Sequence, residues 1–243
     1  NHFGEIEYLS GIALPDAAVI TNIGMSHIEN LGSQEGIFKA KMEITSRFGK
    51  ENTLFVNGDD RFLKNVSSGA YSVVKYGLDQ NCDIYAKDIV NNGLSGISFT
   101  AVCGDAEFKA EVTQPGIHNV YNALAAIAVG MHFGVTAEEC VSGLKHCVYT
   151  SQRLEVITHG IIEVINDCYN SSPDSVRAAL KVQQQSLMKR RIAILGDILE
   201  MGGFAPKAHY DLGEDVASAG IDMLITVGEN AAKMADGARD AGM

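Results

Sequence analysis

The sequence predicts an α/β protein with two domains, the first built on a mixed sheet and the second a Rossmann-like domain. Strand-like and helix-like segments alternate along most of the chain, which is the pattern of strands joined by crossover helices. Residues 82–112 instead alternate apolar and polar positions between turns, which is typical of antiparallel strands. The length of 243 residues suits two modest domains, at roughly 100–200 residues per domain.

The first stretch of the chain has the spacing of one α/β unit. Apolar positions predict a helix over residues 4–14 and a strand over residues 17–23. Ser33 can cap a second helix that runs to about Phe48, because its hydroxyl can accept from an unpaired backbone N–H. A short buried strand is then expected over residues 53–56.

The antiparallel segment carries apolar residues at every second position. Its strands are expected to turn at residues 92–93 and 104–105, where asparagine, aspartate and glycine favour tight turns. A helix follows over residues 119–133, and Thr136 with Glu139 forms a capping box for the next one.

The rest of the chain repeats a strand and then a helix. We expect helices after Pro173 and Lys207, and strands over residues 161–165, 192–195 and 223–227. This rhythm predicts a parallel, doubly wound sheet. The predicted domains therefore span residues 1–151 and 152–243.

Composition limits the possible partners. The net charge of −11 disfavours an extended nucleic-acid surface or an anionic membrane surface. The five cysteines form no CxxC pair, which argues against disulfide or zinc frameworks and fits a reducing cytoplasm. No apolar run approaches the ~18 residues of a membrane helix, so we expect no membrane insertion. The chain opens at Asn1 without a leader-like segment, and we expect a piece truncated at both ends.

Lys41 is the first candidate for chemistry. It shares one helix face with Ile37, Ile44 and Phe48. In one interpretation its stem packs on that face while the ammonium reaches water. In the other, burial lowers its pKa and leaves a neutral amine, which carbon dioxide could convert to an anionic carbamate, an oxygen ligand for magnesium.

Polar side chains at two element ends form a second group of candidates. His27 follows the strand predicted over residues 17–23, at the end where open α/β sheets bind ligands, although magnesium prefers oxygen to imidazole. Asn119 and Asn122 open a helix, where they could cap it or hydrogen-bond a purine edge. Capping suits Asn119 better than Asn122, which lies one turn inside.

The predicted domain junction holds a third group. Arg153 could bind phosphate through its guanidinium or be a solvated surface residue. Asp167 ends a strand, where an acidic side chain can hold a ribose hydroxyl. The run from Asn170 continues to Ser172 and Pro173, which suit the N-cap and first position of a helix whose N-terminus favours anions.

The order of these runs resembles the Mur ligase family over essentially the whole chain. The runs that carry the likeness are Asn1-His2-Phe3-Gly4-Glu5-Ile6, Thr21-Asn22-Ile23-Gly24 with His27, Ala40-Lys41-Met42-Glu43-Ile44, His118-Asn119 with Asn122, Arg153-Leu154-Glu155, and Leu195-Gly196-Asp197-Ile198-Leu199-Glu200-Met201-Gly202. Within the family, the first run, Tyr169-Asn170 and the last run look like the branch that adds D-alanyl-D-alanine.

The resemblance implies an amide-forming ligase that uses ATP and Mg²⁺. ATP would phosphorylate a UDP-muramoyl tripeptide, and the amine of D-alanyl-D-alanine would attack the acyl phosphate. Lys41 would be carbamylated and bind magnesium with His27 as a ligand or neighbour. Nucleotide contacts would come from Asn119, Asn122, Arg153 and Asp167, and substrate contacts from Asn1, His2, Asn22, Asn170 and Ser171. The protein would act as a cytoplasmic monomer.

Two departures leave alternatives open. The chain has no Gly-Lys-Ser/Thr phosphate loop, so we expect these residues alone to make no ADP from ATP. Gln152 stands where the family carries glycine, which puts the flexibility of the junction in doubt. The alternative functions are a ligase like folylpolyglutamate synthetase and a non-catalytic nucleotide-binding module.

Overall fold

The computed structural model describes all 243 residues, which form two compact units. The first comprises residues 1–24 and 31–148, and the second comprises residues 25–30 and 149–243. Residues 25–30 thus group with the second unit, although the sequence assigns them to the first. A loop after a strand carries no compositional signal of the unit against which it will pack.

A six-stranded sheet, in the order β1-β2-β3-β4-β5-β6, organises the first unit. Strands β1 to β4 pair in parallel, while β4, β5 and β6 pair antiparallel, which confirms the predicted mixed sheet. Strand β3 is not predicted from the sequence, because its residues show no alternation. The strands are β1 (Ala17–Ile20), β2 (Thr53–Asn57), β3 (Ser72–Gly77), β4 (Ile84–Asn91), β5 (Ile97–Cys103) and β6 (Ala106–Val112).

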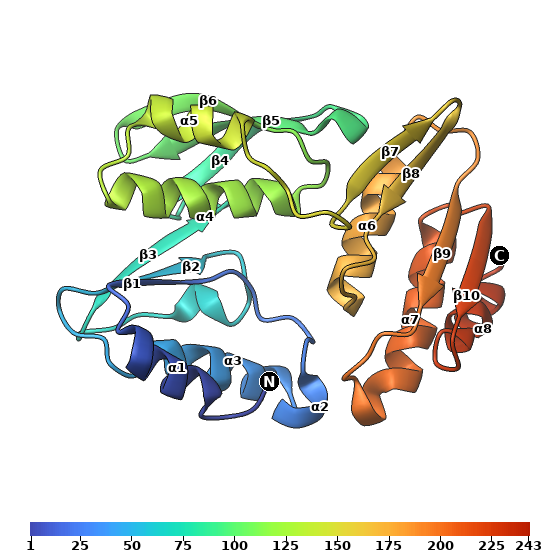
Figure 1. The fold of residues 1–243 in the computed structure, drawn as a ribbon, viewed down its shortest axis with the longest axis horizontal. Coiled ribbons are helices and arrows are strands. Elements are labelled where there is room, and N and C mark those ends of the chain that lie inside the picture. The colour runs from blue at the N-terminus through green and yellow to red at the C-terminus, as the bar shows by residue number, and fades with distance from the viewer. The chain divides into compact units, whose positions relative to one another are not determined.

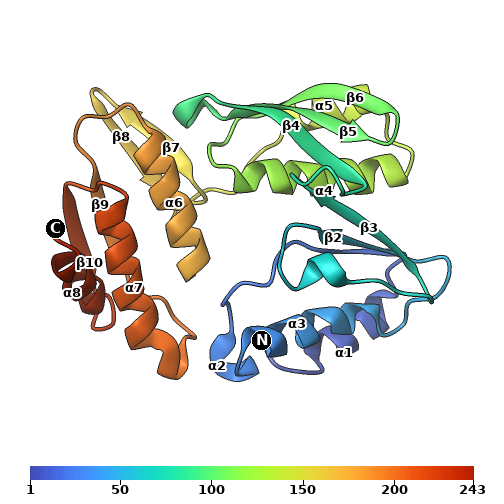
Figure 2. The same ribbon diagram turned by 180° about the vertical axis from the view of Figure 1, so that it is seen from behind.

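The helices of the first unit lie on both sides of this sheet. In Figures 1 and 2, α1 (Glu5–Ala13) and α3 (Gln34–Met42) lie on one side of β1, β2 and β3, and α4 (His118–His132) lies on the other. Helix α5 (Ala137–Lys145) packs against β6. The remaining helical turns of this unit are η1 (Glu43–Thr45), η2 (Leu63–Asn65) and η3 (Gly93–Ser95), whereas most of the short turn α2 (Ile28–Leu31) falls in residues 25–30 of the second unit.

Local capping signals account for where several helices begin. The Ser33 hydroxyl accepts from Gly36 N at 3.1 Å, and Thr136 with Glu139 forms the predicted capping box. The helix predicted to reach Phe48 is shorter, because α3 ends at Met42 and continues only as the 3-10 turn η1. No helix in the chain combines the length and apolar character needed to cross a bilayer.

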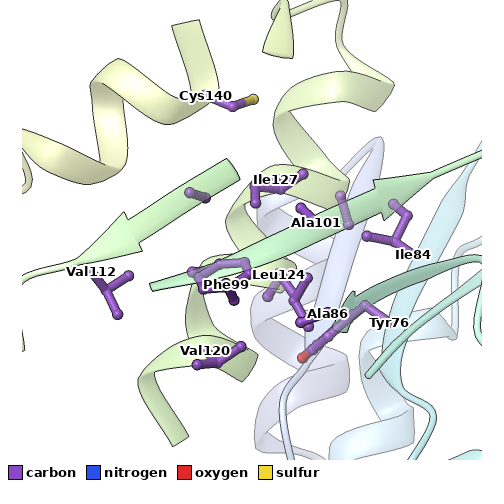
Figure 3. Close-up of a cluster of buried hydrophobic side chains, with 14 of the residues drawn as sticks. Tyr76, Ile84, Ala86, Phe99, Ala101, Val112, Val120, Leu124, Ile127 and Cys140 are labelled. Carbon is purple, nitrogen blue, oxygen red and sulfur yellow. The ribbon is translucent and has the colours of Figure 1, made fainter. Parts of the chain in front are cut away.

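The core of the first unit lies between α4 and the sheet. Phe99 and Ala101 of β5 face Leu124 and Ile127 of α4, and Tyr76 joins them from β3 (Figure 3). These side chains are nearly inaccessible to water, so the alternation along β5 correctly identifies its inward face.

The second unit contains two separate two-stranded sheets. Strands β7 (Glu155–His159) and β8 (Ile162–Asn166) form an antiparallel hairpin, whereas β9 (Ile192–Gly196) and β10 (Met223–Val227) pair in parallel. Strand β7 is not predicted from the sequence, and β8 is expected in the parallel sheet; the antiparallel hairpin corrects both points. Only two residues separate β7 from β8, and the first of them, Gly160, has φ 61°. A connection this short can form a hairpin turn, but it is too short for the crossover that a parallel pair needs.

Three longer helices complete the second unit: α6 (Pro173–Gln185), α7 (Ala205–Ser218) and α8 (Ala232–Asp240). Helix α6 opens as predicted, with Ser172 as N-cap and Pro173 in its first turn. Helices α7 and α8 pack closely at two glycines. A Cβ on Gly213 would lie 2.0 Å from the Met234 carbonyl oxygen, and one on Gly237 would lie 2.1 Å from that of Tyr210. Any larger residue at either position would force the helices apart.

Candidate functional site

Lys41 lies on the last turn of α3, with its side chain half-buried. Its Nζ donates to the Asn22 carbonyl oxygen at 2.7 Å. Burial lowers the pKa of Lys41, while the charge of Asp60 acts in the opposite direction. The amine therefore contacts a defined backbone acceptor at the carboxyl end of β1, which is where parallel strands present ligand sites.

The loop after β1 holds that carbonyl in place. Ile23 N donates to Asp60 Oδ2 at 2.8 Å, and the Ile23 carbonyl accepts from Gln34 Nε2 at 3.1 Å. The Asn22 side chain is exposed and donates to the Thr21 hydroxyl at 3.4 Å. Asp60 and Gln34 were not singled out from the sequence, because neither stands in a run that suggests chemistry.

His27 belongs to the segment that groups with the second unit. Its backbone lies in the left-handed region, at φ 63°, and its Nδ1 hydrogen-bonds the carboxylate of Glu200. Glu29 N also donates to the Glu200 carbonyl at 3.3 Å. Glu200 lies in the Leu195–Gly202 run that was singled out from the sequence. No spacing in the sequence, however, connects Glu200 to His27.

The start of α4 carries the two candidate asparagines. Asn119 is buried, donates through Nδ2 to the Pro115 carbonyl at 2.8 Å, and accepts at Oδ1 from Asn122 Nδ2 at 3.2 Å. The expectation that Asn119 caps the helix is wrong, because Ile117 occupies the N-cap and the Asn119 amide bonds elsewhere. Asn122 is exposed, one turn along, and Asn119 fixes the orientation of its amide.

The segment around Arg153 is held in an unusual backbone conformation. Gln152 and Leu154, on either side of Arg153, have φ 61° and 46°. Leu154 N donates to Asp167 Oδ1 at 3.1 Å, and Tyr169 N donates to the Gln152 carbonyl at 3.1 Å. The Arg153 guanidinium carbon lies 4.1 Å from the centroid of the Tyr169 ring. The structure thus brings Arg153 and Asp167 together through the backbone of Leu154.

Asp167 has a structural role that the sequence does not indicate. Its half-buried carboxylate secures the backbone of Leu154. Burial raises the pKa of Asp167, and the hydrogen bond from Leu154 and the charge of Arg153 act in the opposite direction. Asp167 therefore connects the end of β8 with the backbone that presents Arg153.

The expected substrate residues are mostly exposed and lie in loops. Asn170 accepts at Oδ1 from Ser171 N at 2.9 Å, just before the Ser172 cap of α6. Asn1 and His2 precede α1, where His2 Nδ1 lies 2.9 Å from Glu5 Oε1. Asn1, His2, Asn22, Lys41, Asn119 and Asn122 belong to the first unit, and His27, Arg153, Asp167, Asn170 and Ser171 belong to the second.

The structure contains no group of three or more His, Cys, Asp or Glu side chains placed to hold a metal ion. Lys41 nevertheless fits the part of a magnesium ligand once it is carbamylated. Its burial favours the neutral amine that reacts with carbon dioxide, and the carbamate would keep one N–H for the Asn22 carbonyl. The two carbamate oxygens match the preference of magnesium for oxygen ligands.

Comparison with known proteins gives a consistent result. Residues 1–130 match the Mur ligase middle domain, and residues 152–243 match the Mur ligase, glutamate ligase domain. The UDP-N-acetylmuramoyl-tripeptide D-alanyl-D-alanine ligase of Bacillus subtilis (strain 168) is 39% identical over 239 residues, covering 97% of this chain and 51% of that protein. The ligase of the same name from Escherichia coli (strain K12) is 31% identical, covering 94% of this chain and 51% of its own length.

Solved structures agree with these matches. A crystal structure of MurF from Acinetobacter baumannii superposes with a TM-score of 0.91 at 32% identity, covering 97% of this chain and 52% of that one. This chain thus spans about half the length of the relatives that it matches. Since the two domain matches together cover most of its residues, the chain belongs to the Mur ligase family.

Proposed function

We propose that this chain forms the central and C-terminal parts of an ATP-dependent ligase that joins D-alanyl-D-alanine to UDP-N-acetylmuramoyl-tripeptide. The observation that carries the proposal is the likeness, over 97% of the chain, to the Bacillus subtilis ligase of that name. Membership of the Mur ligase family supports ATP as the phosphoryl donor. The product would be a peptidoglycan precursor, made in the cytoplasm by a monomeric enzyme.

The reaction would proceed in two steps. The γ-phosphoryl group of ATP passes to the terminal carboxylate of the tripeptide, which releases ADP and leaves an acyl phosphate. The amine of D-alanyl-D-alanine then attacks the acyl carbon, so that an amide bond forms and inorganic phosphate leaves. Phosphoryl transfer of this kind depends mostly on positioning and on stabilising charge.

Lys41 and His27 would serve the metal. The carbamate of Lys41 would supply oxygen ligands, and His27 would be a ligand or a close neighbour whose ring is oriented by Glu200. Bound magnesium would neutralise the phosphate charge that develops during transfer.

Four side chains would contact the nucleotide. Asn122 is exposed, and its amide can pair with the edge of adenine while Asn119 keeps it oriented. Arg153 would bind phosphate oxygens, and Asp167 would contact ribose in addition to holding Leu154 N. Asn1, His2, Asn22, Asn170 and Ser171 would contact the two peptide substrates.

The test is phosphate release by the protein expressed from its own gene. With ATP, Mg²⁺ and the UDP-linked tripeptide, release of inorganic phosphate should depend on D-alanyl-D-alanine and match the amide product formed. Release that depends instead on glutamate and a folate would favour the folylpolyglutamate synthetase alternative. Nucleotide binding without turnover under any of these conditions would favour a non-catalytic module.

A further inference from the structure

The peptide unit between Asn22 and Ile23 connects two ionisable side chains. Its carbonyl accepts from Lys41 Nζ at 2.7 Å, and its N–H donates to Asp60 Oδ2 at 2.8 Å. The chain has no cis peptide bond, so this C=O and N–H point in opposite directions within one plane. The hydrogen bond at one end therefore determines where the other end points.

Asp60 is itself firmly held. Its Oδ1 accepts from Phe62 N at 2.9 Å and from Leu63 N at 3.1 Å, at the start of η2. The Leu63 side chain is fully buried, which anchors that turn. With backbone donors on both oxygens, the carboxylate cannot rotate without losing hydrogen bonds.

A second contact fixes the same loop from its other side. Gln34 Nε2 donates to the Ile23 carbonyl at 3.1 Å, and Gln34 Oε1 accepts from Arg61 at 2.6 Å. The side chain of Ile23 is buried. Two residues that follow β2 thus hold the peptide that accepts from Lys41. Asp60 accepts its N–H directly, and Arg61 acts through its hydrogen bond to Gln34.

We propose that Asp60 is a positioning residue for Lys41, which it orients through the Asn22–Ile23 peptide. The inference rests on the proposed function, in which Lys41 carries a carbamate. A carbamate nitrogen has a single N–H, and donating it to the Asn22 carbonyl leaves one direction for the two oxygens. A carboxylate bonded to the N–H end of a peptide also polarises the carbonyl and strengthens its hydrogen bond.

Asp60→Asn tests this role with little disturbance to the turn. The amide oxygen can still accept from Phe62 N and Leu63 N, while the amide nitrogen then faces Ile23 N and cannot accept from it. We expect kcat for ligation to fall about 10–100-fold, as is usual when a residue that orients a metal ligand is lost. Asp83→Asn is the matched control, because Asp83 accepts a backbone N–H from Lys75 at 2.7 Å and does not hold this loop.

A spectroscopic measurement separates positioning from simple loss of charge. Asp60→Asn leaves Lys41 itself in place, so the lysine can still carry a carbamate, but the acceptor that fixes the Asn22–Ile23 peptide is lost. In protein equilibrated with 13C-bicarbonate, we expect Asp60→Asn to keep a carbamate signal at an altered chemical shift while kcat falls. The Asp83→Asn signal should match that of the wild type.

The outcomes are distinct. An Asp60→Asn variant with wild-type kcat and an unshifted carbamate signal overturns the positioning role. If that variant does not fold, Asp60→Glu decides, because it keeps the charge but displaces the carboxylate by one methylene, and wild-type kcat there overturns the role equally. Normal ligation by Lys41→Ala would instead refute the proposed function of Lys41, and with it this inference.

Discussion

The guanidinium carbon of Arg153 lies 4.1 Å from the centroid of the Tyr169 ring. The two residues are joined a second time through the backbone, since Tyr169 N donates to the carbonyl of Gln152 at 3.1 Å. A guanidinium stacked on a ring has already lost part of its rotamer freedom, so less is lost when it binds an anion. This arrangement suits a phosphate-binding role for Arg153.

Replacing Arg153 with alanine should lower kcat/KM for ATP. The loss should correspond to about 1.5–3 kcal/mol of free energy, the range for a hydrogen bond to a charged group. Arg153→Lys should recover only part of the loss, because an ammonium can neither stack on Tyr169 nor bind phosphate through two parallel N–H groups. Steady-state kinetics with varied ATP measure both effects. Unchanged ATP kinetics in Arg153→Ala would mean that Arg153 is an ordinary surface residue.

Tyr169 offers a control for the stacking. Tyr169→Phe keeps the ring and should leave ATP kinetics close to wild type. Tyr169→Leu removes the ring and should raise the KM for ATP, because the guanidinium loses its platform. Equal kinetics for the two variants would contradict a role for the ring.

Local signals predict much of the fold. The structure confirms the predicted N-caps Ser33, Thr136 and Ser172. Each could be predicted because the backbone N–H that it satisfies lies only three residues further along the chain. Strands β3 and β7 were missed, because neither shows a clear period of two and each is recognised through its pairing partner.

The contacts around the candidate residues could not be predicted from the sequence. Lys41 was singled out as a candidate from the helical spacing of its apolar neighbours, but the residues that hold its surroundings were not. Glu200 lies 173 positions from His27, and Asp60 lies 37 positions from Ile23. A single sequence carries no period or motif that connects such positions, so only the folded chain reveals these contacts.

Replacing Gln152 with glycine should not destabilise the protein. Gln152 is exposed and has φ 61°, a conformation that costs an L-residue about 1–2 kcal/mol, while glycine loses roughly 0.5–1 kcal/mol more chain entropy on folding. The free energy of unfolding should therefore stay level or rise by up to about 1.5 kcal/mol in urea titrations. Gln184→Gly, at an exposed position within α6, should lower it by about 0.5–1 kcal/mol. A comparable loss in both variants would contradict the strain at Gln152.

Replacing Lys41 with alanine should nearly abolish ligation, because the carbamate oxygens are lost from the proposed magnesium site. A small carboxylate such as acetate should restore part of the activity by filling the vacated ligand position. Lys41→Arg should stay inactive with or without the carboxylate, because a fixed cation repels the metal. Lys39→Ala, at an exposed position on the same helix, should behave as wild type. Normal turnover by Lys41→Ala would rule out the carbamate.

Asp167 should make the stability of the protein depend on pH in a direction set by its burial. Its folded-state pKa is raised, chiefly by burial, so the native state favours the protonated form. The stability that this group contributes is greatest below its unfolded-state pKa of about 3.9, and it declines as the pH rises through the folded-state value. Asp167→Asn removes the buried charge while its amide oxygen can still accept from Leu154 N. The variant should therefore have a higher Tm than wild type at pH 7, and the difference should shrink as the pH falls towards about 4.

Asp167→Ala serves as the control, because it leaves Leu154 N without its acceptor and should lower Tm at neutral pH. A lower Tm for Asp167→Asn at pH 7, or a difference from wild type that does not change with pH, would show that burial does not penalise the charge of Asp167.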